Sequence, residues 1–280
     1  ESVPIKNYEV PRVHHHYKET SDDKAAWNCL MEAIADVISS GEMTKVVSSR
    51  EVEFTSETPY NVASILANLV DNNPNCFIFG YEKDGRTFVG ASPEILVRHR
   101  GSEILSYALA GTAPKDGPNA WTKEQLLTSE KNLVEHNIVL DRIVNTMKQI
   151  TPDVTVGETG IMELSHLYHL RTIIIAKDST KSLVEWAKIL HPTPALGGEP
   201  REKALALLQE YESHERGMYA APFGFMKDMG DGIVVVAIRS ALIMDNVLYA
   251  YAGCGVVADS DADEEYAETN NKMRTILDAL

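Results

Sequence analysis

The sequence predicts an α+β protein with large, mostly antiparallel β-sheets flanked by helices. Apolar runs of strand length recur along the chain, among them "CFIFGY", "TIIIA" and "IVVVAI". Tight turns such as "EKDGR", "RGS" and "DMGDG" separate neighbouring runs, which favours hairpins. Helical segments are inserted between groups of strands without regular βαβ alternation, and no G-x-G-x-x-G motif occurs. These observations argue against a Rossmann fold.

The first half of the chain begins with a predicted helix over residues 20–40. Thr20 and Asp23 resemble a capping box at its start, and Gly41 ends it. A strand follows in "TKVVSSREVEF", and a short amphipathic helix is predicted over residues 61–71. Four successive strands are then expected at residues 76–81, 87–92, 94–100 and 103–109.

The second half mixes helices with a late meander. The pattern predicts mostly helix over residues 124–150, a strand over 170–177, and helices over 183–190 and 201–211. The segments "GMYAAPFGFMK", "GIVVVAIRSALI" and "NVLYAYAG" predict three antiparallel strands, and a helix from about Asp263 closes the chain. We expect residues 1–280 to form a single domain.

Composition limits the classes of partner. With 44% hydrophobic residues among 280, the chain can bury a sizeable core, yet no apolar run approaches the roughly 18 residues of a membrane span. The formal charge of −15 disfavours nucleic acid and anionic membranes as partners. Three widely spaced cysteines suit a reducing cytoplasm and form no zinc pattern. We expect a cytoplasmic monomer or weak homodimer without a signal peptide.

The stretch "ADSDADEEYAETNNK", residues 258–272, admits two interpretations. Acidic residues gather in first helical turns because they complement the positive end of the helix dipole, so a solvated helix start is the ordinary reading. Glu265, Glu268 and Lys272 nevertheless share one helical face, apart from the apolar residues. That face offers oxygen ligands for a hard cation beside a positive charge for an anion. The stretch alone does not decide between the two.

Further polar residues stand in apolar surroundings. Lys45 is either an edge-strand lysine that reaches water or a buried lysine with lowered proton affinity, suited to be a general base. Glu94, after Pro93, is either a surface residue or a carboxyl that a dry pocket keeps protonated as a general acid. Glu135 is either an exposed helix residue or a magnesium ligand. Arg239, among apolar neighbours, requires an anionic partner.

The segments together resemble the chorismate-utilising enzymes of the menaquinone, siderophore and tryptophan group. The resemblance covers nearly everything from about residue 40 to the end and runs in order through ten short segments. They are "KVVSSR", "GASPE", "ALAGT", "SEKNLVEH", "HLYHLRT", "HPTPALGGEPR", "RGMYAAPFGF", "AIRSALI", "YAGCGVV" and "EEYAETNNK". Two departures from the family are expected: Cys254 occupies the place of a usual alanine, and the chain lacks most of the usual N-terminal region.

The resemblance implies roles for particular residues. Lys45 would be the base and Glu94 the acid, acting on the small-molecule substrate chorismate. Glu135 and Glu268, with Glu265 beside them, would hold Mg²⁺. The other implied roles are substrate contacts: the enolpyruvyl carboxylate would meet Tyr219, Arg239, Lys272 and the backbone at Gly253 and Gly255, and the ring would meet Ala110, Gly111, Thr112 and His169.

The resemblance also suggests which member of the group this is. Relatives of anthranilate synthase use ammonia and lack the base lysine, and aminodeoxychorismate synthases carry a lysine where this chain has Ala110. Water is therefore the expected nucleophile, which leaves isochorismate synthase and salicylate synthase. The "HPTPALGGEPR" segment looks like the former, so isochorismate synthase, an isomerase, is expected. Salicylate synthase, an enzyme like anthranilate synthase component I and a non-catalytic chorismate-binding protein remain the alternatives.

Overall fold

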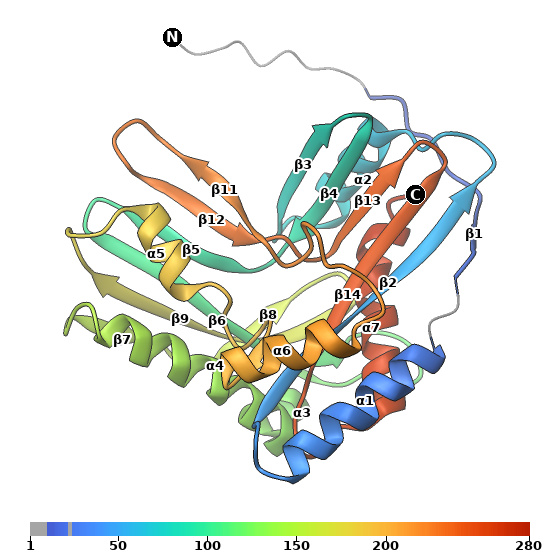
Figure 1. Ribbon diagram of the computed structural model, residues 1–280. Helices are drawn as coiled ribbons and strands as arrows, with labels where there is room; N and C mark the ends of the chain where they lie inside the picture. The colour runs from blue at the N-terminus through green and yellow to red at the C-terminus, as the bar shows by residue number, and fades with distance from the viewer. Residues whose placement is uncertain (1–9, 22–23) are drawn as a thin grey trace.

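The computed structural model describes residues 10–21 and 24–280, and in this part of the chain two antiparallel β-sheets pack against each other with helices around them (Figure 1). The first sheet has the strand order β1-β2-β14-β13-β4-β3, with β10 also paired to β2. Its strands are β1 (Tyr17–Glu19), β2 (Lys45–Ser56), β3 (Phe77–Lys83), β4 (Arg86–Ser92), β10 (Gly198–Glu199), β13 (Ser240–Met244) and β14 (Val247–Val256).

The second sheet has the order β11-β12-β5-β6-β9-β7, with β8 also paired to β9. Its strands are β5 (Ile95–Arg100), β6 (Glu103–Pro114), β7 (Val154–Val156), β8 (Gly160–Glu163), β9 (Leu167–Lys177), β11 (Pro222–Met226) and β12 (Gly232–Val236). Every strand pairing in the described part of both sheets is antiparallel, which confirms the predicted fold class.

Helices cover the outer faces of both sheets. Two of them, α2 and α7, pack on the first sheet, α1 and α6 lie against β2, and α4 and α5 pack on the second sheet. The helices are α1 (Lys24–Ser39), α2 (Val62–Asn72), α3 (Lys123–Thr128), α4 (Glu130–Lys148), α5 (Leu183–Leu190), α6 (Arg201–Tyr211) and α7 (Ala262–Leu277). The largest buried cluster combines residues of both sheets with α4 and α5, so one core spans the two layers.

One predicted strand was wrong. Residues 232–243 were expected to form a single strand, but they form β12 in the second sheet and β13 in the first. The Ile238 N–H donates to the carbonyl of Val236, and Arg239 takes a left-handed φ of 52°. An apolar run with strand propensity thus bends between two sheets, because each half finds its pairing partner in a different layer.

The helix predictions hold, some of them with changed boundaries. The expected helix over 124–150 is divided at Ser129, whose side chain caps α4 by accepting from the Asn132 N–H. The predicted helix at 20–40 is α1, and Asp23 of the proposed capping box lies outside the described residues. The Thr20 hydroxyl donates to Glu53 on β2 instead. Four short strands, β1, β7, β8 and β10, were not predicted.

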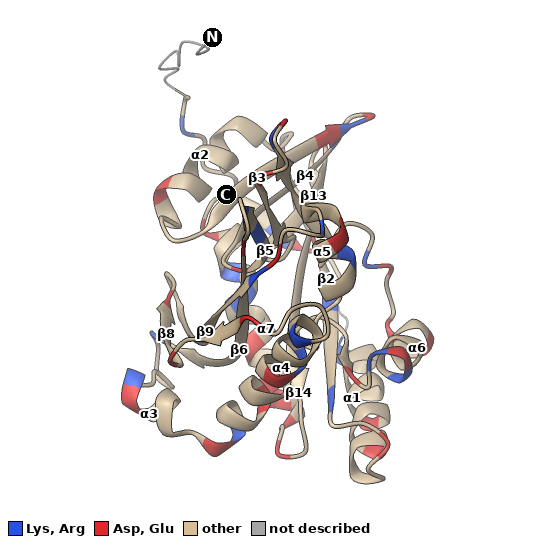
Figure 2. Cartoon of the chain, turned by 90° about the vertical axis from the view of Figure 1, so that its left-hand side faces the viewer, with Lys and Arg blue, Asp and Glu red and all other residues tan. Residues whose placement is uncertain are grey.

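Acidic residues are spread over the helices around the sheets, including α2, α4, α5 and α6 (Figure 2). Within residues 10–21 and 24–280, no helix combines the length and the apolar character needed to cross a bilayer.

Candidate functional site

The candidate site lies where the chain crosses from one sheet to the other. The link between β4 and β5 carries Glu94, and the link between β12 and β13 carries Arg239. Backbone hydrogen bonds hold the two crossings together, because the Val236 N–H donates to the Glu94 carbonyl and the Ala91 N–H donates to the Arg239 carbonyl, each at 3.0 Å. Two polar residues far apart in sequence are thereby placed in the wall of one pocket.

Lys45 enters this pocket from β2 and is fully buried. Its Nζ donates to Glu135 Oε1 of α4 at 2.9 Å. Space for the pair comes from Gly255 on the neighbouring strand β14, since a Cβ there would collide with Glu135 Oε1 and lie 2.6 Å from Lys45 Cε. The alternative of an edge lysine reaching water is wrong for Lys45.

Gly255→Ala should therefore displace the Lys45–Glu135 pair. We expect turnover to fall at least about tenfold, and overpacking to cost about 1–3 kcal/mol of stability. Steady-state kinetics and thermal unfolding would measure both effects. Gly160→Ala is the matched control, because a Cβ at that glycine meets no atom within 4 Å. Wild-type kinetics in Gly255→Ala would show that the glycine is not needed for this geometry.

Glu94 is 3% exposed, and its Oε1 has no hydrogen-bond partner among residues 10–21 and 24–280. Burial raises the pKa of Glu94 to about 8, and the nearby cations, Lys45 first, oppose that rise only in part. The carboxyl is therefore protonated at neutral pH and can donate a proton into the pocket. The alternative of a plain surface glutamate is wrong.

Arg239 is a second buried cation in the wall of this pocket. Its Nη1 has no hydrogen-bond partner in the part of the chain that the structure describes, and its Nη2 donates to His169 Nε2 at 2.7 Å. Burial, followed by the charges of Arg239 and Lys272, holds the pKa of His169 well below its usual range, so the ring is neutral. A guanidinium only donates, so Nε2 must accept and the ring proton lies on Nδ1, 3.0 Å from Thr112 Oγ1.

A β-bulge in β6 shapes the side of the pocket nearest to His169. The register with β9 shifts between Leu109 and Thr112, so that Ala110 and Gly111 stand opposite the single residue Leu170. Gly111 has φ 80°, and a Cβ on it would lie only 2.9 Å from the backbone carbonyl oxygen of Asn132 in α4. Gly111 therefore shapes the bulge but does not line the pocket. Ala110 and Thr112 do line it.

Three further predicted residues, Tyr219, Gly253 and Lys272, meet at the β14 edge of the pocket. Lys272 of α7 donates to the Gly253 carbonyl at 2.7 Å and pairs with Glu268 at 2.6 Å. Tyr219 stacks on Tyr251 with ring centroids 5.5 Å apart, and a Cβ on Gly253 would lie 2.8 Å from its hydroxyl. Cys254 points to the opposite face of β14 and packs in the cluster under α1, because side chains alternate along a strand.

Four basic residues line the pocket of this acidic protein: Lys45, Arg216, Arg239 and Lys272. Lys45 and Lys272 pair with glutamates, and Arg216 pairs with Glu212 at 2.6 Å. Arg239 forms no ion pair with a carboxylate of the described chain, which makes it the strongest candidate for binding an anion. Arg216 was not among the predicted site residues, although it lies in the "RGMYAAPFGF" segment.

The acidic stretch at the start of α7 contains both predicted kinds of residue. Asp261 caps the helix by accepting from the N–H groups of Asp263 and Glu264, and these three residues are exposed, as is Asp259. Glu265 is 3% exposed. The ordinary reading therefore holds for most of the run and fails for Glu265.

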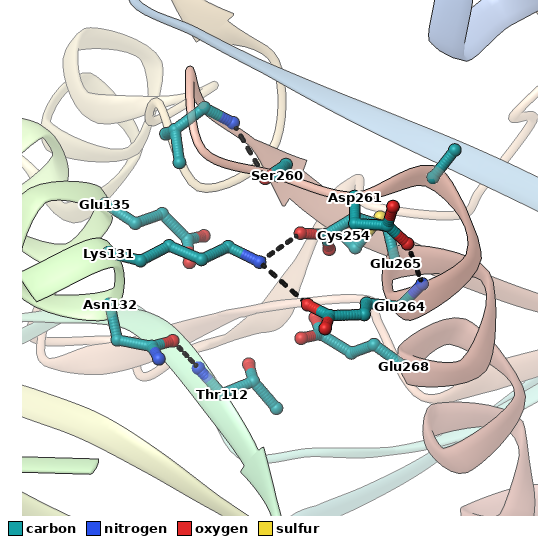
Figure 3. A network of polar contacts seen from close by, with 12 residues as sticks. Thr112, Lys131, Asn132, Glu135, Cys254, Ser260, Asp261, Glu264, Glu265 and Glu268 are labelled. Atoms are coloured by element: carbon teal, nitrogen blue, oxygen red, sulfur yellow. Dashed lines mark hydrogen bonds and ion pairs between the residues drawn. The ribbon is translucent and has the colours of Figure 1, made fainter. Parts of the chain in front are cut away.

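Glu265 and Glu268 face Glu135 of α4 across a second pocket that adjoins the first (Figure 3). Lys131 of α4 lies between the helices, with its Nζ 2.8 Å from Glu265 Oε1 and 3.9 Å from Glu264 Oε2. Burial, and next the Glu268 charge, raise the pKa of Glu265. Because the negative charge of one carboxylate raises the pKa of its neighbour, a cation between them would be stabilised.

The donors in this second pocket suit a hard divalent cation by type, since all are carboxylate oxygens. As the side chains stand, no group of three His, Cys, Asp or Glu residues in the described chain converges closely enough to hold a metal. Each carboxylate instead contacts a lysine: Glu135 contacts Lys45, Glu265 contacts Lys131, and Glu268 contacts Lys272. The pocket can hold a cation when a lysine side chain moves away from its carboxylate partner, above all Lys131 from Glu265.

Comparisons with known proteins agree with this geometry. A family model described as chorismate binding enzyme matches residues 4–280. Isochorismate synthase MenF of Bacillus subtilis is 37% identical over 264 residues, which are 92% of this chain and 56% of that protein. Anthranilate synthase component 1 of Arthrobacter globiformis is 34% identical over 261 residues, covering 89% of this chain and 48% of that protein.

A solved structure is similar over nearly the whole chain. The crystal structure of a putative 2,3-dihydroxybenzoate-specific isochorismate synthase, DhbC from Bacillus anthracis, superposes with a TM-score of 0.89 at 30% identity, covering 97% of this chain and 76% of that one. The chain spans about half the length of the two curated relatives named above. With two sheets that enclose a basic pocket, and a family model that matches it almost from end to end, this chain belongs to the chorismate-binding enzyme family.

Proposed function

We propose that this chain converts chorismate to isochorismate by adding water at C2 while the C4 hydroxyl leaves. The observation that carries the proposal is the placement of the Lys45 amine and the protonated Glu94 carboxyl in one buried pocket. A base and an acid are both required, because one carbon gains a hydroxyl from water while another loses one.

The two residues have separate tasks in this proposal. Lys45, in its unprotonated form, takes a proton from the attacking water, and Glu94 gives a proton to the departing hydroxyl. They enter the pocket from different elements, Lys45 from β2 and Glu94 from the β4–β5 crossing. Each acts on a different carbon of the ring, so neither can replace the other.

The basic lining suits a dianionic substrate. The free Nη1 of Arg239, together with Tyr219 and Lys272, is proposed to bind the enolpyruvyl carboxylate, with the backbone of Gly253 and Gly255 close by. Thr112 and the neutral His169 are proposed to contact the ring hydroxyl region, beside Ala110 and the bulge at Gly111.

The residue at position 110 supports water as the nucleophile. Ala110 provides no amine where, by resemblance, aminodeoxychorismate synthases carry a lysine. Lys45 is present and lies in the pocket, whereas relatives that use ammonia lack it by the same resemblance. Both features favour isochorismate synthase over an enzyme like anthranilate synthase component I. The expected cytoplasmic location and monomeric or weakly dimeric state stay predictions.

The decisive experiment is incubation with chorismate and Mg²⁺ followed by chromatographic identification of the product. We expect isochorismate to accumulate without stoichiometric pyruvate. Anthranilate in the presence of ammonia, or salicylate near neutral pH, would place the chain in a different branch of the family. Binding of chorismate without any turnover would support the non-catalytic alternative.

Glu135 and Glu268, with Glu265 beside them, are proposed to hold Mg²⁺. When bound, the ion would supply a positive charge for the ring carboxylate of the substrate and offset the acidic surroundings. The chain's own part is to keep three carboxylates turned toward one pocket, two of them on α7 and one on α4.

Activity should depend on this ion, and Lys131 should compete with it. Removal of Mg²⁺ with EDTA is expected to abolish turnover. Lys131→Met is expected to tighten Mg²⁺ binding at least about threefold, because the charge-assisted contact between Lys131 and Glu265 no longer has to be broken. Calorimetric titration of Mg²⁺ without substrate measures the second effect. Lys203→Met, at an exposed lysine, is the control. Undiminished turnover in metal-free buffer would overturn the assignment of these carboxylates.

A further inference from the structure

The strand that carries Lys45 has an open edge beside the pocket. On the side away from β14, β10 pairs with Lys45 and Val46, and β1 pairs with residues 54–56. Between these two short strands, no β-strand of the described chain pairs with this edge of β2. Buried backbone groups there still need hydrogen-bond partners.

Side chains of Glu212 and Arg216 provide those partners. The Ser49 N–H donates to Glu212 Oε1 at 2.9 Å, and Arg216 Nη2 donates to the Val47 carbonyl at 2.7 Å. The Val47 N–H donates to the Gly197 carbonyl at 2.9 Å, which continues the line begun by β10. One carboxylate and one guanidinium thus take the positions that a neighbouring strand would fill.

The same pair reaches the loop between α5 and β10. Arg216 Nη1 donates to the carbonyl of Leu196, which lines the pocket, at 2.7 Å. Two further donors, Nε and Nη2, bind both oxygens of Glu212 at 2.8 and 2.6 Å. The guanidinium therefore joins β2, the loop and Glu212 at one point, and the Tyr219 N–H donates to the Arg216 carbonyl at 2.8 Å.

The charge of Arg216 is balanced by a carboxylate, whereas that of Arg239 is not. Arg216 is matched by a buried carboxylate in a two-point ion pair, whereas Arg239 has an unpartnered Nη1. A guanidinium whose charge is already balanced gains little from a second anion. Its position in the pocket wall therefore points to a role in shaping the site.

We propose that Glu212 and Arg216 are positioning residues that complete the open edge of β2 and fix Leu196 relative to Lys45. The expected effect on the reaction rate rests on the proposed function. The expected effect on the structure rests on the backbone contacts of Val47 and Ser49. A shift of about 1 Å between a catalytic group and its substrate can reduce the rate by about a hundredfold. The loss of the pair should therefore act on turnover through Lys45.

Three variants test the proposal. Glu212→Gln/Arg216→Gln removes the ion pair without leaving a lone buried charge. Arg216→Lys keeps the charge but lacks the planar fork that reaches two carbonyls and Glu212. Lys203→Gln on α6 is the control, because that lysine is 55% exposed. The readouts are kcat and KM for chorismate, thermal unfolding, and hydrogen–deuterium exchange of the peptide containing residues 45–50.

We expect the double variant to lose at least about tenfold in kcat/KM and to exchange the Ser49 amide faster, with Arg216→Lys intermediate and the control unchanged. A folded double variant with wild-type kcat/KM and exchange would overturn the proposal. A lowered melting temperature with wild-type kinetics would do the same, because it would mean a structural role alone. If the double variant does not fold, Arg216→Lys decides by the same two readouts.

The proposed function and this inference can fail separately. If the wild-type enzyme makes another product from chorismate, the proposed function fails, and kcat/KM for that product still tests the pair. If it does not turn over at all, the Ser49 exchange rate and the dissociation constant of chorismate decide. Unchanged values of both in the double variant would then overturn the positioning role.

Discussion

Glu94→Gln is expected to lower kcat by at least about a hundredfold, the usual scale of a general acid contribution. The amide keeps the size and neutrality of the protonated carboxyl but cannot release a proton to the leaving hydroxyl. Because Arg239 and Lys272 remain in place, the dissociation constant of chorismate should change little. Steady-state kinetics with isochorismate as the measured product, together with a binding titration, separates the two quantities.

The pH dependence of the wild-type enzyme provides an independent check on Glu94. An acid with a pKa of about 8 loses its proton as the pH rises through that value, so the rate should fall on the alkaline side. The folded-state pKa lies above the ordinary 4.5, so stability contributed by the neutral group is present below about 4.5 and is lost as the pH rises to about 8. Glu94→Gln should therefore gain stability relative to wild type as the pH rises from about 4.5 to about 8.

The matched control for this variant is Glu103→Gln, at a glutamate of the second sheet whose side chain is 42% exposed. It should leave kcat and the pH profile unchanged. If Glu94→Gln keeps more than about a tenth of wild-type kcat, another group must protonate the leaving hydroxyl, and the acid has been misassigned.

Much of the fold could be predicted because local pattern and tertiary structure agree. Residues 183–190 and 201–211 form helices with the predicted bounds, where helical periodicity and start signals coincide. Strand-length runs bounded by turns, such as 87–92, gave strands within a residue or two. The division of 232–243 could not be predicted, because strand propensity says nothing about which sheet offers a partner. Short strands such as β10 depend entirely on the neighbouring strand.

Most residues of the candidate site could be predicted from the sequence, but the contacts among them could not. Ordered short segments brought Lys45, Glu94 and Arg239 to attention, and the structure places all three in one pocket. Nothing in the sequence pairs Glu265 with Lys131, since these residues lie 134 positions apart and meet only because α4 and α7 face each other. Arg216 was missed for a similar reason: two of its four side-chain hydrogen bonds go to backbone carbonyls, which no residue pattern records.

Lys45→Met is expected to reduce kcat at least about a hundredfold while chorismate and Mg²⁺ still bind. Methionine fills much of the volume of the fully buried lysine but has no amine to accept a proton from water. Glu135 loses its partner at 2.9 Å, so Mg²⁺ should bind at least as tightly as in wild type, whereas Glu135→Gln should weaken Mg²⁺ and substrate binding together. Calorimetric titrations of both ligands and single-turnover kinetics distinguish the chemical step from binding.

The buried position of Lys45 makes a check on folding necessary for this test. Breaking a buried ion pair by removing one partner destabilises proteins by about 3–5 kcal/mol, so circular dichroism and thermal unfolding should accompany the kinetics. Lys115→Met is the control, because that lysine pairs with Glu163 at the surface and lies outside the pocket lining. A folded Lys45→Met enzyme that binds chorismate but turns over slowly supports water activation by the lysine. Near wild-type kcat would refute it, because the water attacking C2 would then have lost its proton to some other group, and the ammonia-using and non-catalytic alternatives would have to be tested again.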